Sequence, residues 1–205
     1  MMTNTIMKNS TTSNYRDNLP DFVHKFSVED HNYWKPKLLD SIELMKKRCN
    51  SKPNKEGYYY DFNEPEPRTY KELVDNILFE FNNIICEKYG LRAAGTETPI
   101  HPNQEIQYWY QQYFKGSSFG WHQHSGHWAF VYYVELENTS DSTEFLNYGQ
   151  FDVKEGDIIY FPTFLVHRSP TITSDTRKTI IAGNLKFTVD RELIKRYGKE
   201  HFRNR

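Results

Sequence analysis

The feature that most constrains the fold is a series of short runs, rich in aromatic and β-branched residues, in the second half of the chain. These strand-like runs cover residues 107–113, 128–136, 157–161 and 178–187. Clusters of Gly, Ser, Asn and Asp separate them, and short strands at such spacing are typical of a β-sandwich or barrel. Aromatic residues favour strands and large cores, and the chain contains 15 Tyr, 14 Phe and 4 Trp. The sequence therefore predicts a mainly β (α+β) fold with a jelly-roll core at about residues 100–188.

Two helical patterns precede this region and are expected to cover one face of a sheet. Residues 32–48 place apolar side chains at a period of 3.6 and end in three basic residues, which suit a helix C-terminus. A second pattern begins with a capping-box signature at Thr69 and runs to Tyr89, where Gly90 predicts its end. Between the two helices, residues 50–67 carry Pro, Gly and charge and predict a loop.

The length of 205 residues suits one domain. We expect a disordered lead-in at residues 1–20, which are rich in polar residues and lack the apolar segment of a signal peptide. A single domain is expected over residues 21–205. Within it, the prediction places helical support at about 30–90, the jelly-roll core after it, and a C-terminal helix at about 189–205.

Charge and cysteine content restrict the setting of the protein. The 26 Lys and Arg residues nearly balance the 27 Asp and Glu residues, so no electrostatic basis exists for a nucleic-acid or anionic-membrane partner. The longest apolar runs are of strand length and too short to span a bilayer. Of the two cysteines, Cys49 and Cys86, the second lies in an apolar helical pattern that favours a buried free thiol. These observations predict a cytoplasmic protein.

Three histidines form the strongest chemical pattern. His122 and His124 are two residues apart, so in a strand both side chains point to the same face and can hold one metal ion. His167 follows the strand-like run 157–161, and jelly-roll topology can return it beside the first pair. Arg177 enters the next strand, from which a guanidinium can clamp a carboxylate bidentately. The sequence therefore predicts a metal site with a nearby anion-binding residue.

This arrangement resembles the iron(II)/2-oxoglutarate-dependent oxygenases. The matching features are His122-x-His124, a Gly-Asp-x-x-x-Phe-Pro segment followed by His167, and Arg177 in Arg-Lys-Thr-Ile-Ile. The similarity is greatest to the small prolyl-hydroxylase-like branch of marine phages and bacteria, and it covers about residues 105–188. The resemblance implies a double-stranded β-helix, Fe(II) and 2-oxoglutarate as cofactors, and hydroxylation of a substrate with release of succinate and carbon dioxide.

The resemblance also implies roles for single residues. His122 and His167 match the two histidine ligands, and Arg177 matches the basic residue that pairs with the distal carboxylate of 2-oxoglutarate. Tyr113 resembles the strand tyrosine that hydrogen-bonds the same co-substrate, and Asn184 lies where a polar residue often faces the pocket.

The chain departs from the family at His124, because a carboxylate normally occupies this position of the metal-binding triad. His124 can itself be a ligand and complete a three-histidine site, which the period-2 geometry favours. Alternatively, Glu144 on the next strand supplies the carboxylate, or His124 faces away and leaves a position open, as halogenases do.

Four further residues are candidates for the substrate pocket: His127, Trp109, Trp121 and Trp128. His127 lies at odd spacing from the histidine pair, so a bulge would be needed to bring it to the same face. The remaining, isolated histidines are expected at the surface: His24, His31, His101 and His201.

The sequence does not identify the substrate. A protein side chain or a small molecule fits, while the balanced charge disfavours nucleic acid. Small jelly-rolls of this kind can dimerise through their helices, so a homodimer is one expectation.

Two other functions stay open. One is a cupin-type metalloprotein, a thiol dioxygenase or isomerase, which would use Glu144 and no 2-oxoglutarate. The other is a non-catalytic jelly-roll module for binding or for a virion.

Overall fold

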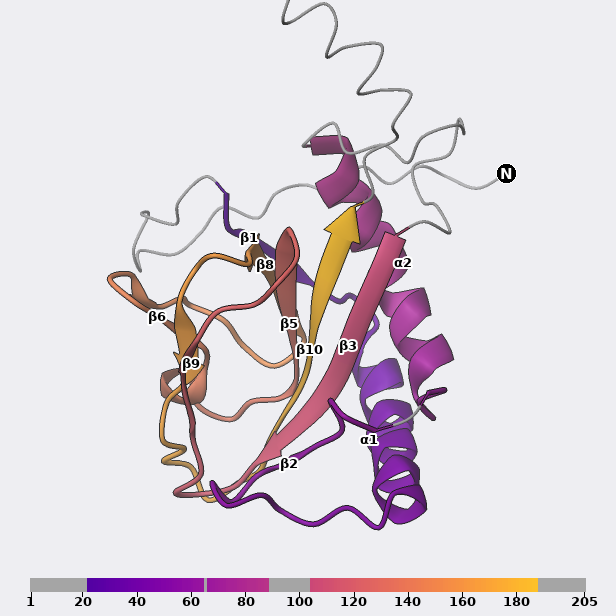
Figure 1. Ribbon diagram of the computed structural model, residues 1–205, viewed down its shortest axis with the longest axis vertical. Coiled ribbons are helices and arrows are strands. Elements are labelled where there is room, and N and C mark those ends of the chain that lie inside the picture. Colours follow the sequence, from indigo (N-terminus) through magenta and orange to yellow (C-terminus); the bar gives the residue numbers. More distant parts are fainter. Residues whose placement is uncertain (1–21, 65, 89–103, 188–205) are drawn as a thin grey trace, which may run out of the picture.

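Two antiparallel sheets form the body of the molecule, and two helices pack on one of them (Figure 1). The computed structural model describes residues 22–64, 66–88 and 104–187. The larger sheet has six strands in the order β1-β8-β5-β10-β3-β2. These strands are β1 (His24–Ser27), β2 (Tyr59–Tyr60), β3 (Gln104–Tyr113), β5 (Trp128–Glu135), β8 (Asp157–Pro162) and β10 (Lys178–Phe187). The smaller sheet has the order β4-β9-β6-β7, with β4 (Phe119–His122), β6 (Glu144–Phe145), β7 (Gly149–Gln150) and β9 (His167–Ser169).

This architecture confirms the predicted jelly-roll and its principal strands. All four strand-like runs of the sequence lie in the larger sheet, as β3, β5, β8 and β10. The short strands β4 and β6 contain His122 and Glu144, which were expected on strands. The short strands β1, β2, β7 and β9 were not predicted, and β2 interrupts the region expected to be a loop. The expected lead-in and the expected C-terminal helix lie outside the described residues.

Alternating side chains of the larger sheet divide the apolar residues into two cores. On β10, Ile181 and Leu185 face the core that contains the helices. Ile180 and Ala182 point the other way, into a core between the two sheets. Because successive residues of a strand point to opposite faces, both faces of this sheet are buried. The second core is the one that surrounds the candidate site.

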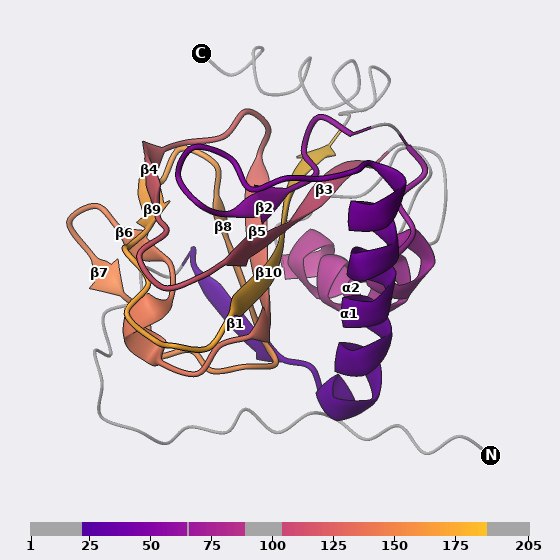
Figure 2. The same cartoon turned by 90° about the horizontal axis from the view of Figure 1, so that it is seen from below.

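Both predicted helices are present and lie against the outer face of the larger sheet (Figure 2). Helix α1 spans His31–Arg48 and buries Leu38, Ile42 and Met45, and its last turn is basic as expected. Helix α2 spans Lys71–Lys88. The helices therefore close one side of the larger sheet and leave its other side to the smaller sheet.

His31 corrects the expectation that the isolated histidines lie at the surface. Its side chain is buried, with Nδ1 at 2.7 Å from the Tyr132 hydroxyl and Nε2 at 3.4 Å from the Glu155 carboxylate. Burial lowers the pKa of the ring, although the Glu155 hydrogen bond opposes this shift. His31 therefore helps join the start of α1 to the sheet.

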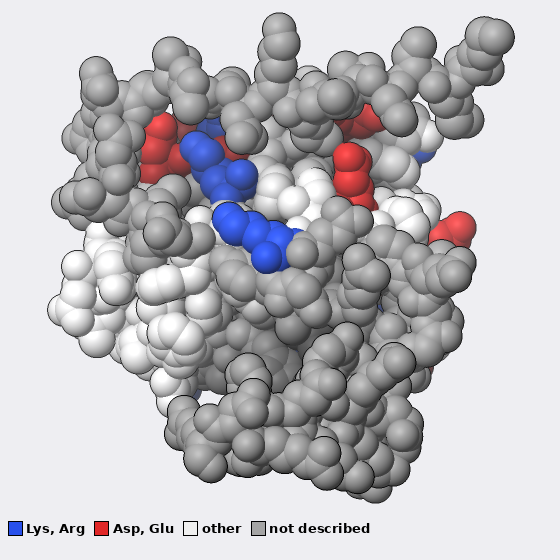
Figure 3. Space-filling view, turned by 90° about the horizontal axis from the view of Figure 1, so that it is seen from above, with Lys and Arg blue, Asp and Glu red and all other residues white. Residues whose placement is uncertain are grey.

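Charged side chains of both signs share the described part of the face shown in Figure 3, in keeping with a net charge of −1. Within the described ranges, neither helix has the length and hydropathy required to cross a membrane.

Candidate metal centre

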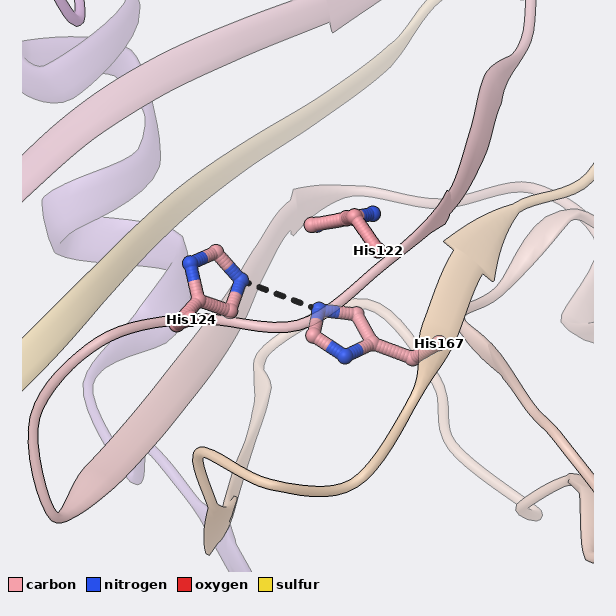
Figure 4. A group of neighbouring side chains, drawn as sticks. All are labelled: His122, His124 and His167. Atoms are coloured by element: carbon pink, nitrogen blue, oxygen red, sulfur yellow. Dashed lines mark hydrogen bonds between the residues drawn. The ribbon is translucent and has the colours of Figure 1, made fainter.

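The three predicted histidines meet between the two sheets (Figure 4). His122 ends β4 and lies directly opposite His167, the first residue of β9. His124 follows two residues later, where its backbone N–H donates to the Thr163 carbonyl at 3.2 Å. Strand pairing and this loop contact therefore bring together residues that are far apart in the sequence.

The spacing of the three rings suits a single metal ion. One ligand nitrogen of each of His122, His124 and His167 lies within 4.8 Å of the others. The Nε2 atoms of His124 and His167 are 3.1 Å apart. Two imidazole nitrogens bound to one metal at about 2.1 Å, with a right angle between the bonds, would be about 3.0 Å apart. The nitrogens of His124 and His167 are therefore close to the separation of two ligands of one metal ion. A shift of the His122 ring on the order of an ångström would bring the third nitrogen to a similar separation.

Backbone carbonyls orient two of the rings. His122 Nδ1 donates to the Gly120 carbonyl at 2.9 Å, and His167 Nδ1 donates to the Leu165 carbonyl at 2.8 Å. Because Nδ1 carries the proton in each neutral ring, the lone pair remains on Nε2, and in His167 this atom lies 3.1 Å from Nε2 of His124. Hydrogen bonds of this kind to metal-binding histidines hold the ring and the tautomer that ligation requires.

The histidines are also held in the neutral form that binds a metal. Burial, followed by the charge of His122, lowers the pKa of His124 to about 4. Burial is again the principal cause that lowers the pKa of His167 to about 3, with the charges of His122 and His124 adding to it. The pKa of His122 is lowered by burial as well. Protons therefore compete weakly for these nitrogens near neutral pH.

The cluster opens into a cavity of about 410 Å³, which lies within the size range of small-molecule sites. Its walls come from both sheets and are mainly aromatic. They comprise Tyr58, Tyr60, Phe62, Trp109, Gln111, Tyr113, Phe119, His122, Gln123, His124, Phe130, Val131, Thr143, Phe161, His167, Arg168, Ser169, Ile180 and Ala182. No Asp or Glu belongs to this set of described residues.

Two lining residues of the cavity, Tyr113 and Ser169, lie beside a buried lysine that is not itself a lining residue. Tyr113 is fully buried, which raises its pKa, and its hydroxyl makes no hydrogen bond of normal geometry, although the Ser169 side chain is near enough to oppose the rise in pKa. Directly opposite Tyr113 on β10, Lys178 donates to the Asp141 carbonyl at 2.6 Å and to the Ser169 hydroxyl at 2.9 Å. Its ammonium lies 5.0 Å from the centre of the Tyr113 ring. Since an ammonium has three N–H donors, one is left for a further acceptor.

Lys178 was not singled out from the sequence, in which Arg177 was the expected anion-binding residue. Arg177 does not line the cavity; its guanidinium binds both Glu135 carboxylate oxygens, at 2.7 and 3.0 Å. Adjacent residues of a strand point to opposite faces, and Lys178 shares the inward face with Ile180. Neither Arg177 nor Lys178 is a lining residue, but Lys178 contacts the lining residue Ser169, whereas Arg177 is paired with Glu135.

The alternative carboxylate, Glu144, is not brought to the histidines. It pairs with Arg168 at 2.7 Å, and the two residues are direct neighbours on β6 and β9. The Arg168 guanidinium also lies 4.5 Å from the ring centre of Trp121, which is 42% exposed. Glu144 and Trp121 are not among the cavity residues.

The other candidates divide between the cavity and its surroundings. Trp109 lines the cavity, and its ring centre is 5.7 Å from that of His124. Trp128 belongs to the core beneath the helices instead. His127 is exposed and Asn184 is buried, and neither is a lining residue.

Comparison with known proteins identifies the fold. No family model and no curated sequence matches the chain. Among solved structures, a prolyl-4-hydroxylase from Pseudomonas putida is similar, with a TM-score of 0.56, 12% identity, and coverage of 82% of this chain and 94% of that one. A 2OG-Fe(II) oxygenase family member from Burkholderia pseudomallei gives a TM-score of 0.58 at 12% identity, covering 80% and 84%.

A third similar structure is HygX from Streptomyces hygroscopicus, which was solved with nickel, 2-oxoglutarate and hygromycin B. It gives a TM-score of 0.55 at 8% identity, covering 82% of this chain and 83% of that one. At such low identities the likeness concerns the fold, which this chain shares with these oxygenases.

Proposed function

We propose that this protein is an iron(II)- and 2-oxoglutarate-dependent dioxygenase that hydroxylates a substrate not yet identified. The observation that carries the proposal is the position of His122, His124 and His167 in one cavity, whose lining residues Tyr113 and Ser169 contact the buried Lys178. The fold shared with 2-oxoglutarate oxygenases supports it.

The three histidines fit a divalent iron ion. Imidazole nitrogen is a suitable donor for Fe(II), and three protein ligands leave positions for a co-substrate and dioxygen. His124 takes the place that a carboxylate has in the usual triad, so the ligands leave the charge of the metal uncompensated. We therefore favour the three-histidine alternative over Glu144, whose carboxylate is paired with Arg168.

The part of the cavity beside Tyr113 and Ser169 fits the distal carboxylate of 2-oxoglutarate. A carboxylate there can accept from the remaining N–H of Lys178 and from the Tyr113 hydroxyl, which would otherwise stay buried without a partner. Ser169 holds the ammonium from the other side. We assign the anchoring role to Lys178 in place of Arg177, and we retain Tyr113 in the role expected from the sequence.

When bound, iron and 2-oxoglutarate supply the oxidising chemistry, with succinate and carbon dioxide as co-products. The residues of the chain bind, orient and exclude water. The Gly120 and Leu165 carbonyls accept from Nδ1 of His122 and His167, so that Nε2 of each neutral ring carries no proton and is available as a ligand. The aromatic walls keep the reacting C–H bond of the substrate in a dry environment.

The two alternative functions have less support. A cupin-type site would need Glu144 as a ligand, but this residue is paired with Arg168. A binding module without catalysis would leave the neutral histidine cluster and the buried Lys178 without a purpose. The cytoplasmic setting and the homodimer expected from the sequence remain predictions.

Anaerobic titration with Fe(II) and then 2-oxoglutarate tests the proposal. The chelate of the two has a weak visible charge-transfer band. We expect the band in the wild type, its loss in His167→Ala, and a far higher requirement for 2-oxoglutarate in Lys178→Met. Arg177→Ala, which alters a cation outside the cavity, is the matched control. Iron binding without a band would exclude 2-oxoglutarate and revive the cupin alternative, while no iron binding would refute the proposal.

A further inference from the structure

A short edge segment supplies three aromatic rings to the cavity. Strand β2 pairs with β3 at the edge of the larger sheet (Figure 2). Tyr58, Tyr60 and Phe62, at every second position, all line the cavity. The residues between them face the helices: Tyr59 packs on the helix-side core and Asp61 is buried beside it. Strand alternation thus makes this segment an aromatic wall.

The wall is held in place from its other side. The Asp61 carboxylate accepts from the Tyr70 hydroxyl at 2.6 Å and from the Tyr110 backbone N–H at 2.9 Å. It also pairs with the buried Arg68 at 3.2 Å, and Arg68 donates to the Asp61 carbonyl at 3.0 Å. Phe62 follows this buried network directly, so its position does not depend on burial of its own ring, which is 40% exposed.

A line of rings runs from the metal centre to this exposed residue. His124 lies beside Trp109, and Trp109 meets Phe62 edge-on, with ring centres 4.8 Å apart and planes at 90°. Tyr60 also lines the cavity and lies directly opposite Gln111 on β3, two positions from Trp109. A planar group placed against Trp109 would contact these rings and lie next to the metal ligand.

Charge at this end of the cavity is sparse. Apart from the three neutral histidines, Arg168 is the one ionisable lining residue of Lys, Arg, Asp or Glu type within the described ranges, and its guanidinium binds Glu144. Gln111 and Gln123 add amide groups. Moving a charged group into such surroundings costs free energy without a counterion, whereas a neutral ring with an amide partner is accommodated.

We propose that Tyr60, Phe62 and Trp109 form a subsite for an uncharged planar ring of the substrate. That the occupant is the substrate rests on the proposed function, but binding of a ring at this subsite requires neither iron nor 2-oxoglutarate. The subsite places the ring beside His124, so Phe62 and Tyr60 select the substrate by shape and neutrality.

Saturation-transfer NMR on the full chain, without metal and with Zn(II), tests this subsite. The probes are benzamide, benzoate and benzylamine, which share one ring and differ in charge, and cyclohexanecarboxamide, which is neutral but not planar. Loss of an aromatic contact weakens binding by about two- to tenfold. We therefore expect Phe62→Ala to lower the affinity for benzamide by this factor, and Phe62→Leu to lower it less.

Phe79→Ala is the matched control, because Phe79 is also exposed but lies on α2. It should leave benzamide binding unchanged. Benzoate that binds through Lys178 would be insensitive to Phe62→Ala. The proposal is overturned if Phe62→Ala has no effect on benzamide, or if benzylamine or cyclohexanecarboxamide binds equally well in a Phe62-dependent manner. If benzamide binding depends on Phe62 but the titration with Fe(II) and 2-oxoglutarate gives no band, the subsite is retained and only the dioxygenase function is rejected.

Discussion

Replacement of Lys178 by Met should have opposite effects on stability and on ligand binding. The side chain is fully buried, and burial lowers the pKa of its ammonium from 10.5 to about 7, with the charge of Asp141 opposing the shift. Since one pKa unit corresponds to about 1.4 kcal/mol, the native state at pH 6 is penalised by a free energy on the order of 5 kcal/mol. Met has a similar shape and no charge, so it removes this penalty.

The effect on stability depends on pH in a defined direction. Between pH 7 and 10.5 the unfolded chain holds the Lys178 proton and the native protein does not, so the stability of the wild type rises with pH there. The variant lacks this titration. It also leaves the Asp141 carbonyl and the Ser169 hydroxyl without their donor, which costs about 1–3 kcal/mol at any pH. We expect Lys178→Met to be more stable than the wild type at pH 6. Between pH 6 and pH 9.5, the difference in free energy of unfolding should shift by about 3 kcal/mol in favour of the wild type.

Ligand binding should change in the other direction. A hydrogen bond to a charged group contributes about 1.5–3 kcal/mol, so the variant should bind 2-oxoglutarate about ten- to a hundredfold more weakly. Urea denaturation at both pH values and calorimetric titration of the zinc-loaded protein measure the two effects. Lys115→Met, which removes an exposed lysine, is the control and should change neither. A stability difference that is independent of pH, together with unchanged affinity, would refute the reasoning.

Three further predictions concern the metal and its surroundings. His167→Ala should abolish tight metal binding, whereas Glu144→Ala should change the metal affinity by no more than about twofold. Competition with a chromogenic chelator measures both affinities, and an equal loss in the two variants would make Glu144 a ligand. Because the pKa values of His124 and His167 are lowered to about 4 and about 3, metal affinity should stay nearly constant from pH 7.5 to 6; a tenfold loss for each pH unit over this range would contradict the neutral cluster. Arg177→Ala should lower stability by about 1–3 kcal/mol, because it leaves the Glu135 carboxylate without its bidentate partner, and should leave 2-oxoglutarate affinity unchanged in the same calorimetric titration.

The sequence carries more information on the long strands and on the histidines than on the rest of the site. Strands β3, β5, β8 and β10 are readable because each is a long run of strand-forming residues. Strand period predicted that His122 and His124 share a site, although β4 ends at His122 and a backbone hydrogen bond to Thr163 places His124; topology predicted the return of His167. The two-residue strand β2 carries no such signal, since its pairing with β3 depends on tertiary contacts that hold Asp61.

The residue proposed to bind the co-substrate shows why the inward face of β10 is hard to assign from the sequence. Both faces of β10 are buried, so apolar side chains occupy both of them and alternation does not mark the inward one. Arg177 and Lys178 are adjacent, and a register shift follows at Thr179 and Ile180. Neither residue lines the cavity, but Lys178 donates to Ser169, which does, whereas the Arg177 guanidinium binds Glu135. The orphaned Tyr113 hydroxyl, which only the structure reveals, identifies the inward residue.

Charge explains how a three-histidine centre and a buried lysine can coexist at one cavity. The histidines are neutral, so a divalent ion would keep its full charge, and Lys178 can add another positive charge beside Tyr113 and Ser169. No described carboxylate lines the cavity to balance them. Under the proposed function, a dicarboxylate does so, with one carboxylate at the metal and the other at Lys178. The metal and the co-substrate then act as counterions for each other, and each favours binding of the other by the same free energy. Under this function, a carboxylate at position 124 would weaken this mutual dependence, because it would itself balance part of the charge of the metal.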